Sequence, residues 1–329
     1  MSASCLLDRR SGSCSFQNLA MTHGEAVRDA VEADGGQVIR NRESDKEIKT
    51  PLIRYEETTW QFAKRMGSLL GAYIIPDVET GNPNLWFGMR AGKEIPALSE
   101  EHCSVRICPM GEKAGTYIQM EGRAFYKIGD WMTFMDQKVT ITVVEGRYEH
   151  GELTFVYTLE DRETHQPVLC DENHPGGLGL WGNIKEVKGE TVSIALDIDN
   201  GEETGDYFYP WYPETGNALY AMPEKGAGAL LHFFEEEERG GAVIHCLNKK
   251  LENERYYKDR VMDIEDGNSI QLKEGVSFNR GGSHTLSLND GAVSASISKE
   301  LKIRAEEKIW LKARQIVINT PEELNLCQG

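Results

Sequence analysis

The chain has 329 residues, of which 40% are hydrophobic and 27% are charged, and its formal net charge is −17. This length is enough for two or three domains with sizeable cores. We expect no nucleic acid partner, because binding phosphates requires a basic face, and anionic membrane surfaces are disfavoured for the same reason. Seven unevenly spaced cysteines indicate reduced thiols.

The N-terminal segment shows neither a secretory signal nor a transmembrane run, since residues 1–16 lack a continuous apolar stretch. We therefore expect a protein that is made in the cytoplasm without a signal peptide. If it leaves the cell, a machine carries it outward. Residues 1–20 and 40–50 are expected to be irregular.

Two capping boxes predict two short helices. The first pairs Thr22 with Glu25 and predicts a helix that runs to about Ala33; the second pairs Thr58 with Gln61. Both helices should end at glycines, which are Gly35, Gly36 and Gly71. The apolar side chains expected on the buried sides are Val27, Ala30, Val31, Trp60, Phe62, Ala63, Met66, Leu69 and Leu70.

Short β-runs follow the second helix. In one of them Val139, Ile141 and Val143 alternate with threonines, which is typical of a half-buried strand. The runs predicted as strands in this part of the chain are 72–76, 85–89, 105–107, 117–120, 139–144 and 153–159.

A turn-rich segment at 171–177 predicts a domain boundary. Beyond it, five closely spaced strands fit a small closed barrel of the oligonucleotide/oligosaccharide-binding (OB) type. A charged linker is expected at 249–266, and the turn Asn289-Asp290-Gly291 predicts a tight hairpin. The five strands are predicted at 182–187, 191–198, 207–211, 227–234 and 242–247.

An apolar pattern repeats about every eight residues in the last part of the chain, between Lys, Arg, Glu, Gln and Asn. One such short unit cannot enclose a core, so the units must stack on neighbours or on other chains. We therefore expect a rigid β-structure made by several chains. The positions expected to pack inside it are Ile297, Leu301, Ile303, Ile309, Leu311, Ile316 and Ile318.

Several motifs resemble the VgrG-like spike and hub proteins of contractile injection systems, which include proteins of the late control D and baseplate assembly V types. In the predicted barrel, the matching positions are Gly182, Val187, Trp211, Pro223 and Gly226. After Gly226 the chain lacks the acidic residue that is usual in the family. Upstream, the run 51–62 is similar to the hub or tube-adaptor segment of that family through Tyr55, Glu57, Trp60 and Phe62.

The resemblance implies a mainly β protein with two short helices, divided into a partial hub domain (1–172), a five-stranded OB barrel (173–250) and a linker with a trimeric β-prism or β-helix shaft (251–329). Family members have a further hub barrel before the first helix, and we expect it to be missing here. The implied partners are two further copies of the chain, inner tube and baseplate proteins, and a PAAR-like tip protein or effector.

The implied function is that of a needle that joins the inner tube and pierces a target envelope, in a phage tail (as a virion component), a tailocin or a type VI-like secretion system. We expect no enzyme activity and no cofactor. Between Leu247 and Leu286 the chain is too short for an inserted lysozyme domain. The alternative hypothesis is an acidic OB-fold module that binds carbohydrate or protein through exposed aromatic side chains; exposure of Trp181 and Trp211 distinguishes the two.

Two groups of residues have side chains of the types that bind metals, but we expect no metal at either, because the first has a spacing that matches no standard zinc pattern and the second lies on a linker where polar turn residues gather. The run 235–238 of four glutamates is expected to be a solvated turn between two strands. The two groups are His102, Cys103 and Cys108, and His165, Cys170, Asp171 and His174.

Overall fold

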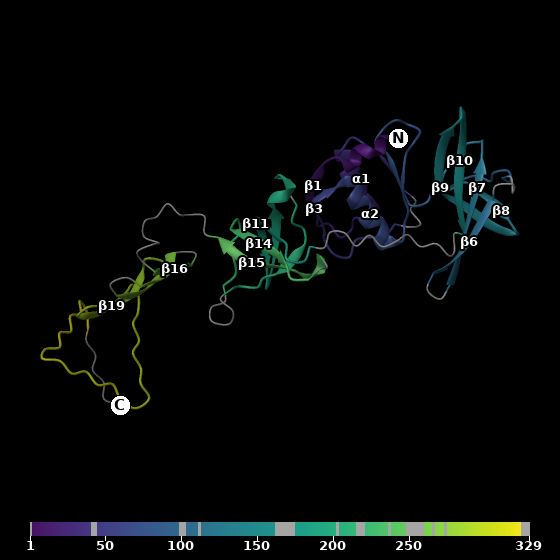
Figure 1. The fold of residues 1–329 in the computed structure, drawn as a ribbon. Helices are drawn as coiled ribbons and strands as arrows, with labels where there is room; N and C mark the ends of the chain where they lie inside the picture. The colour runs from purple at the N-terminus through teal and green to yellow at the C-terminus, as the bar shows by residue number, and fades with distance from the viewer. Residues whose placement is uncertain are drawn as a thin grey trace. The chain divides into compact units, whose positions relative to one another are not determined.

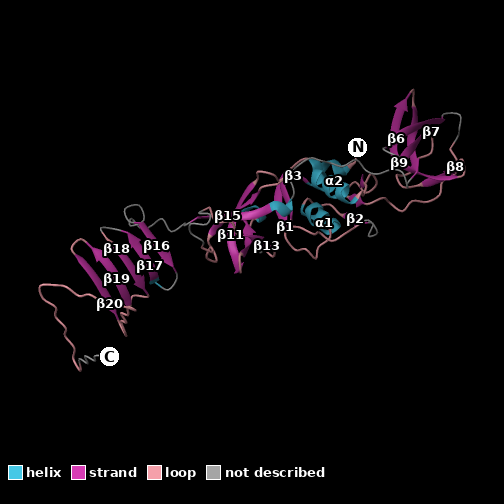
Figure 2. Ribbon diagram, turned by 90° about the horizontal axis from the view of Figure 1, so that it is seen from below, coloured by secondary structure: helices cyan, strands magenta, loops and turns pink. Residues whose placement is uncertain are grey.

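The computed structural model describes residues 2–40, 45–98, 103–110, 113–161, 175–201, 204–214, 221–235, 238–247, 260–264, 267–272 and 275–323. The chain forms two compact units, residues 1–249 (unit 1) and 250–329 (unit 2). Figures 1 and 2 show that strands dominate both and that the helices gather near the N-terminus, which confirms the mainly β class with two α-helices. Within the described ranges, no helix has the length and apolarity needed to span a membrane.

The N-terminal segment is ordered, contrary to expectation. Residues Ala3–Asp8 form a 3₁₀-helix, and β1 (Ser11–Phe16) pairs antiparallel with β3 (Leu52–Thr58). The irregular assignment of residues 1–20 was therefore wrong, because β1 gains its ladder from a partner about forty residues away that local sequence does not reveal. A second small sheet has the order β2-β5-β4 and consists of β2 (Val38–Arg40), β4 (Ile74–Pro76) and β5 (Leu85–Phe87).

Helix α1 (His23–Ala33) begins at the predicted capping box. The Thr22 side chain accepts from the Glu25 amide, and the Thr22 amide donates to Glu25 Oε2 at 3.0 Å. Asp45 reinforces this end by accepting from Thr22 Oγ1 (2.8 Å) and from the Gly24 amide (2.9 Å). A residue from the expected loop at 40–50 thus satisfies a helix terminus.

Helix α2 (Thr59–Leu70) also begins at its predicted capping box and ends at Gly71, which adopts a φ of 63°. Phe62, Ala63 and Met66 are buried in the core shared with α1, as predicted. Leu69 is exposed, so its predicted burial was wrong; Arg65 takes a buried place on this helix instead. Arg65 is held there by a buried ion pair with Glu57, which helical periodicity does not predict.

Asp77 anchors the loop between β4 and β5. Its carboxylate accepts from the Glu79 amide (3.0 Å) and from the Thr80 hydroxyl, and its carbonyl accepts from the Ser2 hydroxyl. Burial alone would raise the pKa of the Asp77 carboxyl, but hydrogen bonds from Thr80, Glu79 and Asn84 outweigh it and hold the pKa below 3.8.

Because the Asp77 pKa is lower in the folded state, its stabilising effect is present above about pH 4 and is lost as the pH falls through the folded-state value. The Asp77→Asn variant is therefore expected to lose about 1 kcal/mol at pH 7 and less at pH 2.5. Urea unfolding of both proteins at the two pH values measures this. An equal difference at both values would contradict the role given to the charge.

The second sheet of unit 1 has the order β6-β7-β10-β9-β8 and its own apolar core. The predicted alternation holds at Val139 and Ile141, which are buried, but Val143 is exposed. A β-bulge lies between them: Ile141 pairs with Leu159 and Val143 with Thr158, so Thr142 is an extra residue that turns Val143 outward. The strands are β6 (Cys103–Met110), β7 (Lys113–Gly122), β8 (Trp131–Phe134), β9 (Gln137–Glu149) and β10 (Glu152–Asp161).

All five strands predicted for the barrel are present, as one curled sheet with the order β13-β12-β11-β14-β15. A parallel bridge between Trp211 and Val243 joins its two outer ends. The assignment of this sheet to the OB type stays a prediction, and the predicted boundary at 172/173 lies outside the described residues. The strands are β11 (Gly179–Lys188), β12 (Thr191–Leu196), β13 (Phe208–Pro210), β14 (Gly228–Phe233) and β15 (Gly241–Leu247).

Unit 2 contains a five-stranded antiparallel meander with the order β16-β17-β18-β19-β20. The predicted hairpin is confirmed: Asn289 pairs with Ala292 across Asp290-Gly291, and Gly291 has a φ of 88°. The expectation of a linker at 249–266 was wrong for residues 260–264, which form a strand. The strands are β16 (Arg260–Ile264), β17 (Asn268–Leu272), β18 (Val276–Arg280), β19 (His284–Asn289) and β20 (Ala292–Ile297).

Candidate functional site

The sheet of unit 2 has one apolar and one polar face. In an antiparallel pair, directly opposed residues lie on the same face, and so do residues two apart along a strand. The pairing of Ile270 with Phe278, Phe278 with Leu286, and Leu286 with Ala295 therefore defines one row of a single face. We call this the apolar face; on β17–β20 it carries Ile270, Leu272, Val276, Phe278, Leu286, Leu288, Val293, Ala295 and Ile297.

The polar face is built from small hydrogen-bonding side chains. Asn279 Nδ2 and Gln271 Nε2 donate to Ser269 Oγ at 3.2 and 3.1 Å, and Thr285 Oγ1 donates to Asn279 Oδ1 at 3.2 Å. These contacts run across the strands β17, β18 and β19. These side chains of the polar face thus form hydrogen bonds with one another.

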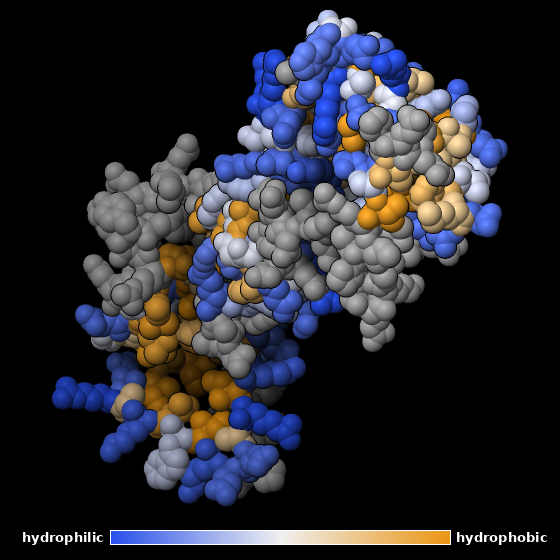
Figure 3. Space-filling model, turned by 45° about the vertical axis from the view of Figure 1, so that its right-hand side comes forward, coloured by the Kyte–Doolittle hydropathy of each residue, from blue (hydrophilic) through white to orange (hydrophobic). Residues whose placement is uncertain are grey.

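Burial on the two faces is opposite to what a single folded chain requires. Phe278 is 44% exposed on the apolar face, whereas Ser269 on the polar face is 9% exposed. Figure 3 shows apolar side chains of this unit gathered in one contiguous area. Contiguous exposed apolar surface of this kind marks an interaction site, because leaving each such side chain in water costs roughly 1.5–3 kcal/mol relative to burial.

The residues after β20 extend this exposed surface. Residues 301–323 form no strand, and the structure places every predicted shaft position in contact with solvent. Ile297 lies on β20, and the other six positions lie in extended chain beyond it. Their packing inside a multi-chain shaft stays a prediction. The positions concerned are Ile297, Leu301, Ile303, Ile309, Leu311, Ile316 and Ile318.

The hub-motif residues lie around β3 and α2. Leu52 on β3 packs into the core of α1 and α2, whereas the neighbouring Ile53 and Tyr55 pack into the core of the curled sheet. The two cores therefore share one strand. Trp60 and Phe62 belong to the α1–α2 core.

Glu57, the remaining hub-motif residue, is at the centre of a buried ionic cluster. Its side chain is 2% exposed and accepts two hydrogen bonds from Arg65, at 3.1 and 3.0 Å. Arg65 also donates to Glu238 Oε1 (2.8 Å) and to the Ile53 carbonyl (2.8 Å). Burial alone lowers the pKa of the Arg65 guanidinium, but the hydrogen bonds and charges of Glu57 and Glu238 raise it overall, so Arg65 stays charged.

This cluster corrects the expectation for the glutamate run at 235–238. Glu238 is not a solvated turn residue, since it pairs with Arg65 from a helix more than 170 residues earlier in the chain. Glu236 and Glu237 lie outside the described residues. The contact joins α2 to the β14–β15 connection of the curled sheet.

The barrel-motif residues have structural roles. Gly182 lies so close to β12 that a Cβ there would approach the Ala195 carbonyl oxygen to 2.3 Å. Trp211 is buried and donates from Nε1 to the Ala221 carbonyl at 2.8 Å. Gly226 has a φ of 82° and donates to the Ile184 carbonyl at 2.7 Å. Val187 packs partly buried against the sheet core, and Pro223 is buried.

The aromatic side chains of the curled sheet are divided between core and surface. Trp211 is 7% exposed and Trp181 is 42% exposed, so the alternative of one exposed aromatic cluster is not what the sheet presents. Tyr209 is fully enclosed, and burial, with the charges of Tyr207 and Asp199, raises the pKa of its hydroxyl. Tyr220 lies outside the described residues.

Most of the candidate metal ligands lie outside the described residues. Cys103 is described, as the first residue of β6, whereas the side chain of Cys108 and all of His102 are not. The second group, residues 165–174, also lies outside the described residues. Among the residues that are described, no group of three or more His, Cys, Asp or Glu side chains could hold a metal ion.

The sequence did not predict the strands β16–β18 or the Arg65–Glu238 pair. A signal for the strands was present, since Ser269 to Leu272 and Val276 to Phe278 alternate polar and apolar residues. The ionic pair has no local signal, because its members are 173 residues apart.

Comparisons with known proteins identify a related fold. No protein-family model and no curated protein matches the sequence. Among solved structures, a chain of the half-lidded Francisella PdpA–VgrG complex is similar with a TM-score of 0.50 and 8% identity, over 88% of this chain and 70% of that chain. A chain of the lidded complex gives a TM-score of 0.49 and 8% identity over 89% and 64% of the two chains. At this identity, the first likeness shows that the chain has a fold related to that of its neighbour.

Proposed function

We propose that the chain is a structural spike component of an injection or secretion machine and that three copies assemble through the apolar face and residues 297–318. The observation that carries this proposal is the inverted burial in unit 2, where apolar side chains face solvent and small polar side chains satisfy one another. A monomer would leave this surface in water, and identical copies can cover it.

The related fold and the resemblance of the motifs support the proposal that the machine is an injection or secretion system. The similar solved chain comes from the Francisella PdpA–VgrG complex, and the hub-type residues Tyr55, Glu57, Trp60 and Phe62 lie on the adjoining elements β3 and α2. We infer that unit 1 connects to tube or baseplate proteins and that unit 2 forms the needle. Inward apolar rows would give a stiff shaft, because pairing between chains removes free sheet edges.

The mass of the assembled protein tests this proposal. Sedimentation at about 1 µM should give three times the chain mass of 36.9 kDa, and a stable monomer would contradict the proposal. The Ile309→Asp variant should dissociate, because three carboxylates would lie near one axis without partners. A variant that kept the mass of three chains would show that residues 297–318 do not form the shaft.

A further inference from the structure

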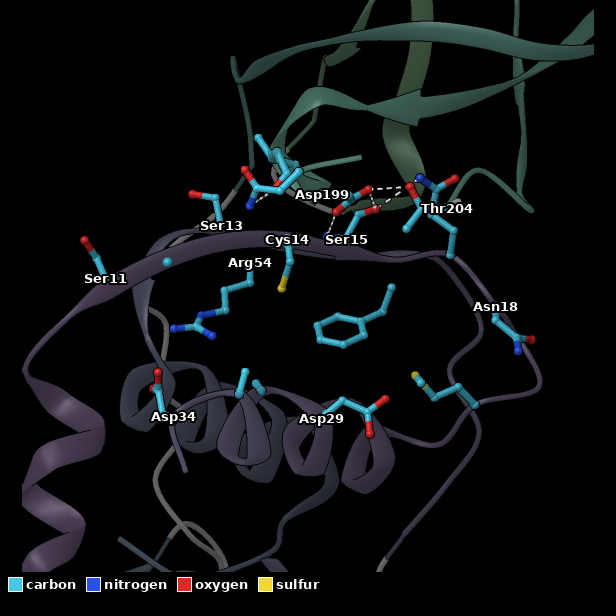
Figure 4. A pocket seen from close by; sticks show the side chains of 18 of the residues that line it. Ser11, Ser13, Cys14, Ser15, Asn18, Asp29, Asp34, Arg54, Asp199 and Thr204 are labelled. Atoms are coloured by element: carbon cyan, nitrogen blue, oxygen red, sulfur yellow. Dashed lines mark hydrogen bonds between the residues drawn. The ribbon is translucent and has the colours of Figure 1, made fainter. Parts of the chain in front are cut away.

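Unit 1 contains a cleft of about 610 Å³ that the spike proposal does not use. Strand β1, helix α1, Arg54 on β3 and the segment 198–206 line it. Figure 4 shows Arg54 and Cys14 on the side of β1 that faces α1. The volume falls within the range of small-ligand sites, about 300–1,000 Å³.

Arg54 is the unusual group in this cleft. It is 6% exposed, and its only hydrogen bond within the described residues runs from Nε to the Glu57 carbonyl at 2.9 Å. No carboxylate in the described part of the chain forms an ion pair with its two terminal nitrogens. A buried guanidinium is normally paired, because removing its charge from water is costly.

The carboxylates that line the cleft are already engaged. Asp29 accepts from Arg28 (2.7 Å), Asp34 accepts from the Thr59 hydroxyl (2.5 Å), and Asp206 lies 3.4 Å from Lys185. Asp199 accepts from the Ser15 amide at 2.6 Å and from the hydroxyls of Ser15 and Thr204. Arg54 is therefore the buried charged group of the cleft that still has donors to offer, whereas Arg10, which also lines the cleft, is exposed.

The backbone leaves room for Arg54 by means of a glycine. A Cβ at Gly12 would lie 3.0 Å from Arg54 Nη2 and 3.3 Å from its Cζ, so any larger residue would crowd the guanidinium. Phe16, Met21 and Ala30 also line the cleft and give it an apolar wall.

We propose that the cleft between β1 and α1 binds a carboxylate joined to a small apolar group, such as the carboxyl terminus of a peptide with an apolar last residue. The carboxylate accepts from the two terminal nitrogens of Arg54, the fork geometry that arginine offers to this anion. The apolar group lies against Phe16 and Met21. This site is independent of the trimer proposed above.

Ligand-observed NMR on the full-length protein tests the site with three probes. N-acetyl-leucine should bind at least about 10-fold more tightly than N-acetyl-leucinamide, which lacks the carboxylate, and more tightly than inorganic phosphate, which lacks the apolar group. Equal binding of acid and amide, or no binding of either, would overturn the proposal. Phosphate as the tightest probe would show a general anion site and would also overturn it.

Variants and a reporter cysteine locate the site. Arg54→Met should weaken N-acetyl-leucine binding at least about 10-fold, Arg54→Lys should weaken it less, and Arg123→Met, at an exposed arginine of another sheet, should leave it unchanged. N-acetyl-leucine should also slow labelling of Cys14 by N-ethylmaleimide but not that of the exposed Cys5.

The acid–amide comparison uses the native protein, so it decides the question even where Arg54→Met does not fold. Gly12→Ala is the second variant. Its added methyl group crowds the Arg54 guanidinium, and the charge of Arg54 is kept. Unchanged acid binding in a folded Arg54→Met variant, or protection of Cys5 to the same extent as Cys14, would refute the location.

Discussion

The Phe278→Glu variant is expected to remain monomeric at concentrations where the native chain forms trimers. Phe278 lies in the middle row of the apolar face, between Ile270 and Leu286 on the neighbouring strands. Each of three copies would lose the burial of a phenyl ring and place a carboxylate in an apolar interface, so we expect a loss of about 3 kcal/mol or more, a factor of at least ~100 in the assembly constant. Sedimentation over a concentration series measures the change.

The control is Ser277→Glu, the adjacent position on β18, whose side chain points to the polar face. It adds the same charge to the same strand and should leave the trimer intact. If both variants dissociate, strand β18 is sensitive to charge in general and the apolar face has no special role. If neither does, the chains associate through another surface.

The Arg65→Met variant is expected to lose about 3–5 kcal/mol of unfolding free energy. Removing the guanidinium leaves the Glu57 carboxylate at 2% exposure with neither of its two hydrogen bonds from Arg65, and it also frees Glu238. A buried charge that has lost its partner costs far more than the pair contributes. Urea unfolding of the full chain, followed by circular dichroism and tryptophan fluorescence, measures the loss.

Arg123→Met provides a matched comparison, because Arg123 and Glu152 form a pair whose side chains are 79% and 63% exposed. That variant should change stability by no more than about 0.5 kcal/mol. Replacing Glu57 as well, in an Arg65→Met/Glu57→Leu double variant, should recover part of the loss, since no unpaired charge remains at position 57. A loss below about 1 kcal/mol for Arg65→Met alone would contradict the buried-charge argument.

Elements governed by local chemistry were predictable from the sequence. Both capping boxes are present as predicted, because the Thr22 and Thr58 side chains accept hydrogen bonds from backbone amides only three residues further along the chain. The same holds for the hairpin at Asp290-Gly291 and for the five strands of the curled sheet, each of which carries its own apolar run.

Features that depend on distant partners were not predictable. Strand β1 is polar and rich in serine, and it becomes a strand only because β3 pairs with it. The bulge at Thr142 turns the side chain of Val143 to the other face of the sheet, and no glycine or proline in the sequence marks its position. Nothing in the local sequence distinguishes Arg54 and Arg65 from ordinary surface arginines. Gly12, which lies against Arg54, and Glu238, which pairs with Arg65, are both distant in the sequence.

Strand β3 has a consequence for the order in which the protein folds. It contributes Leu52 to one core and Ile53 to another, and the second core is otherwise built from residues 180–243. During synthesis β3 leaves the ribosome well over a hundred residues before the last of these partners, so one of its faces stays uncovered for that interval. Such long-range contacts slow folding and leave apolar surface open to misassociation. The core of the curled sheet therefore cannot be completed around β3 until residue 243 has been synthesised.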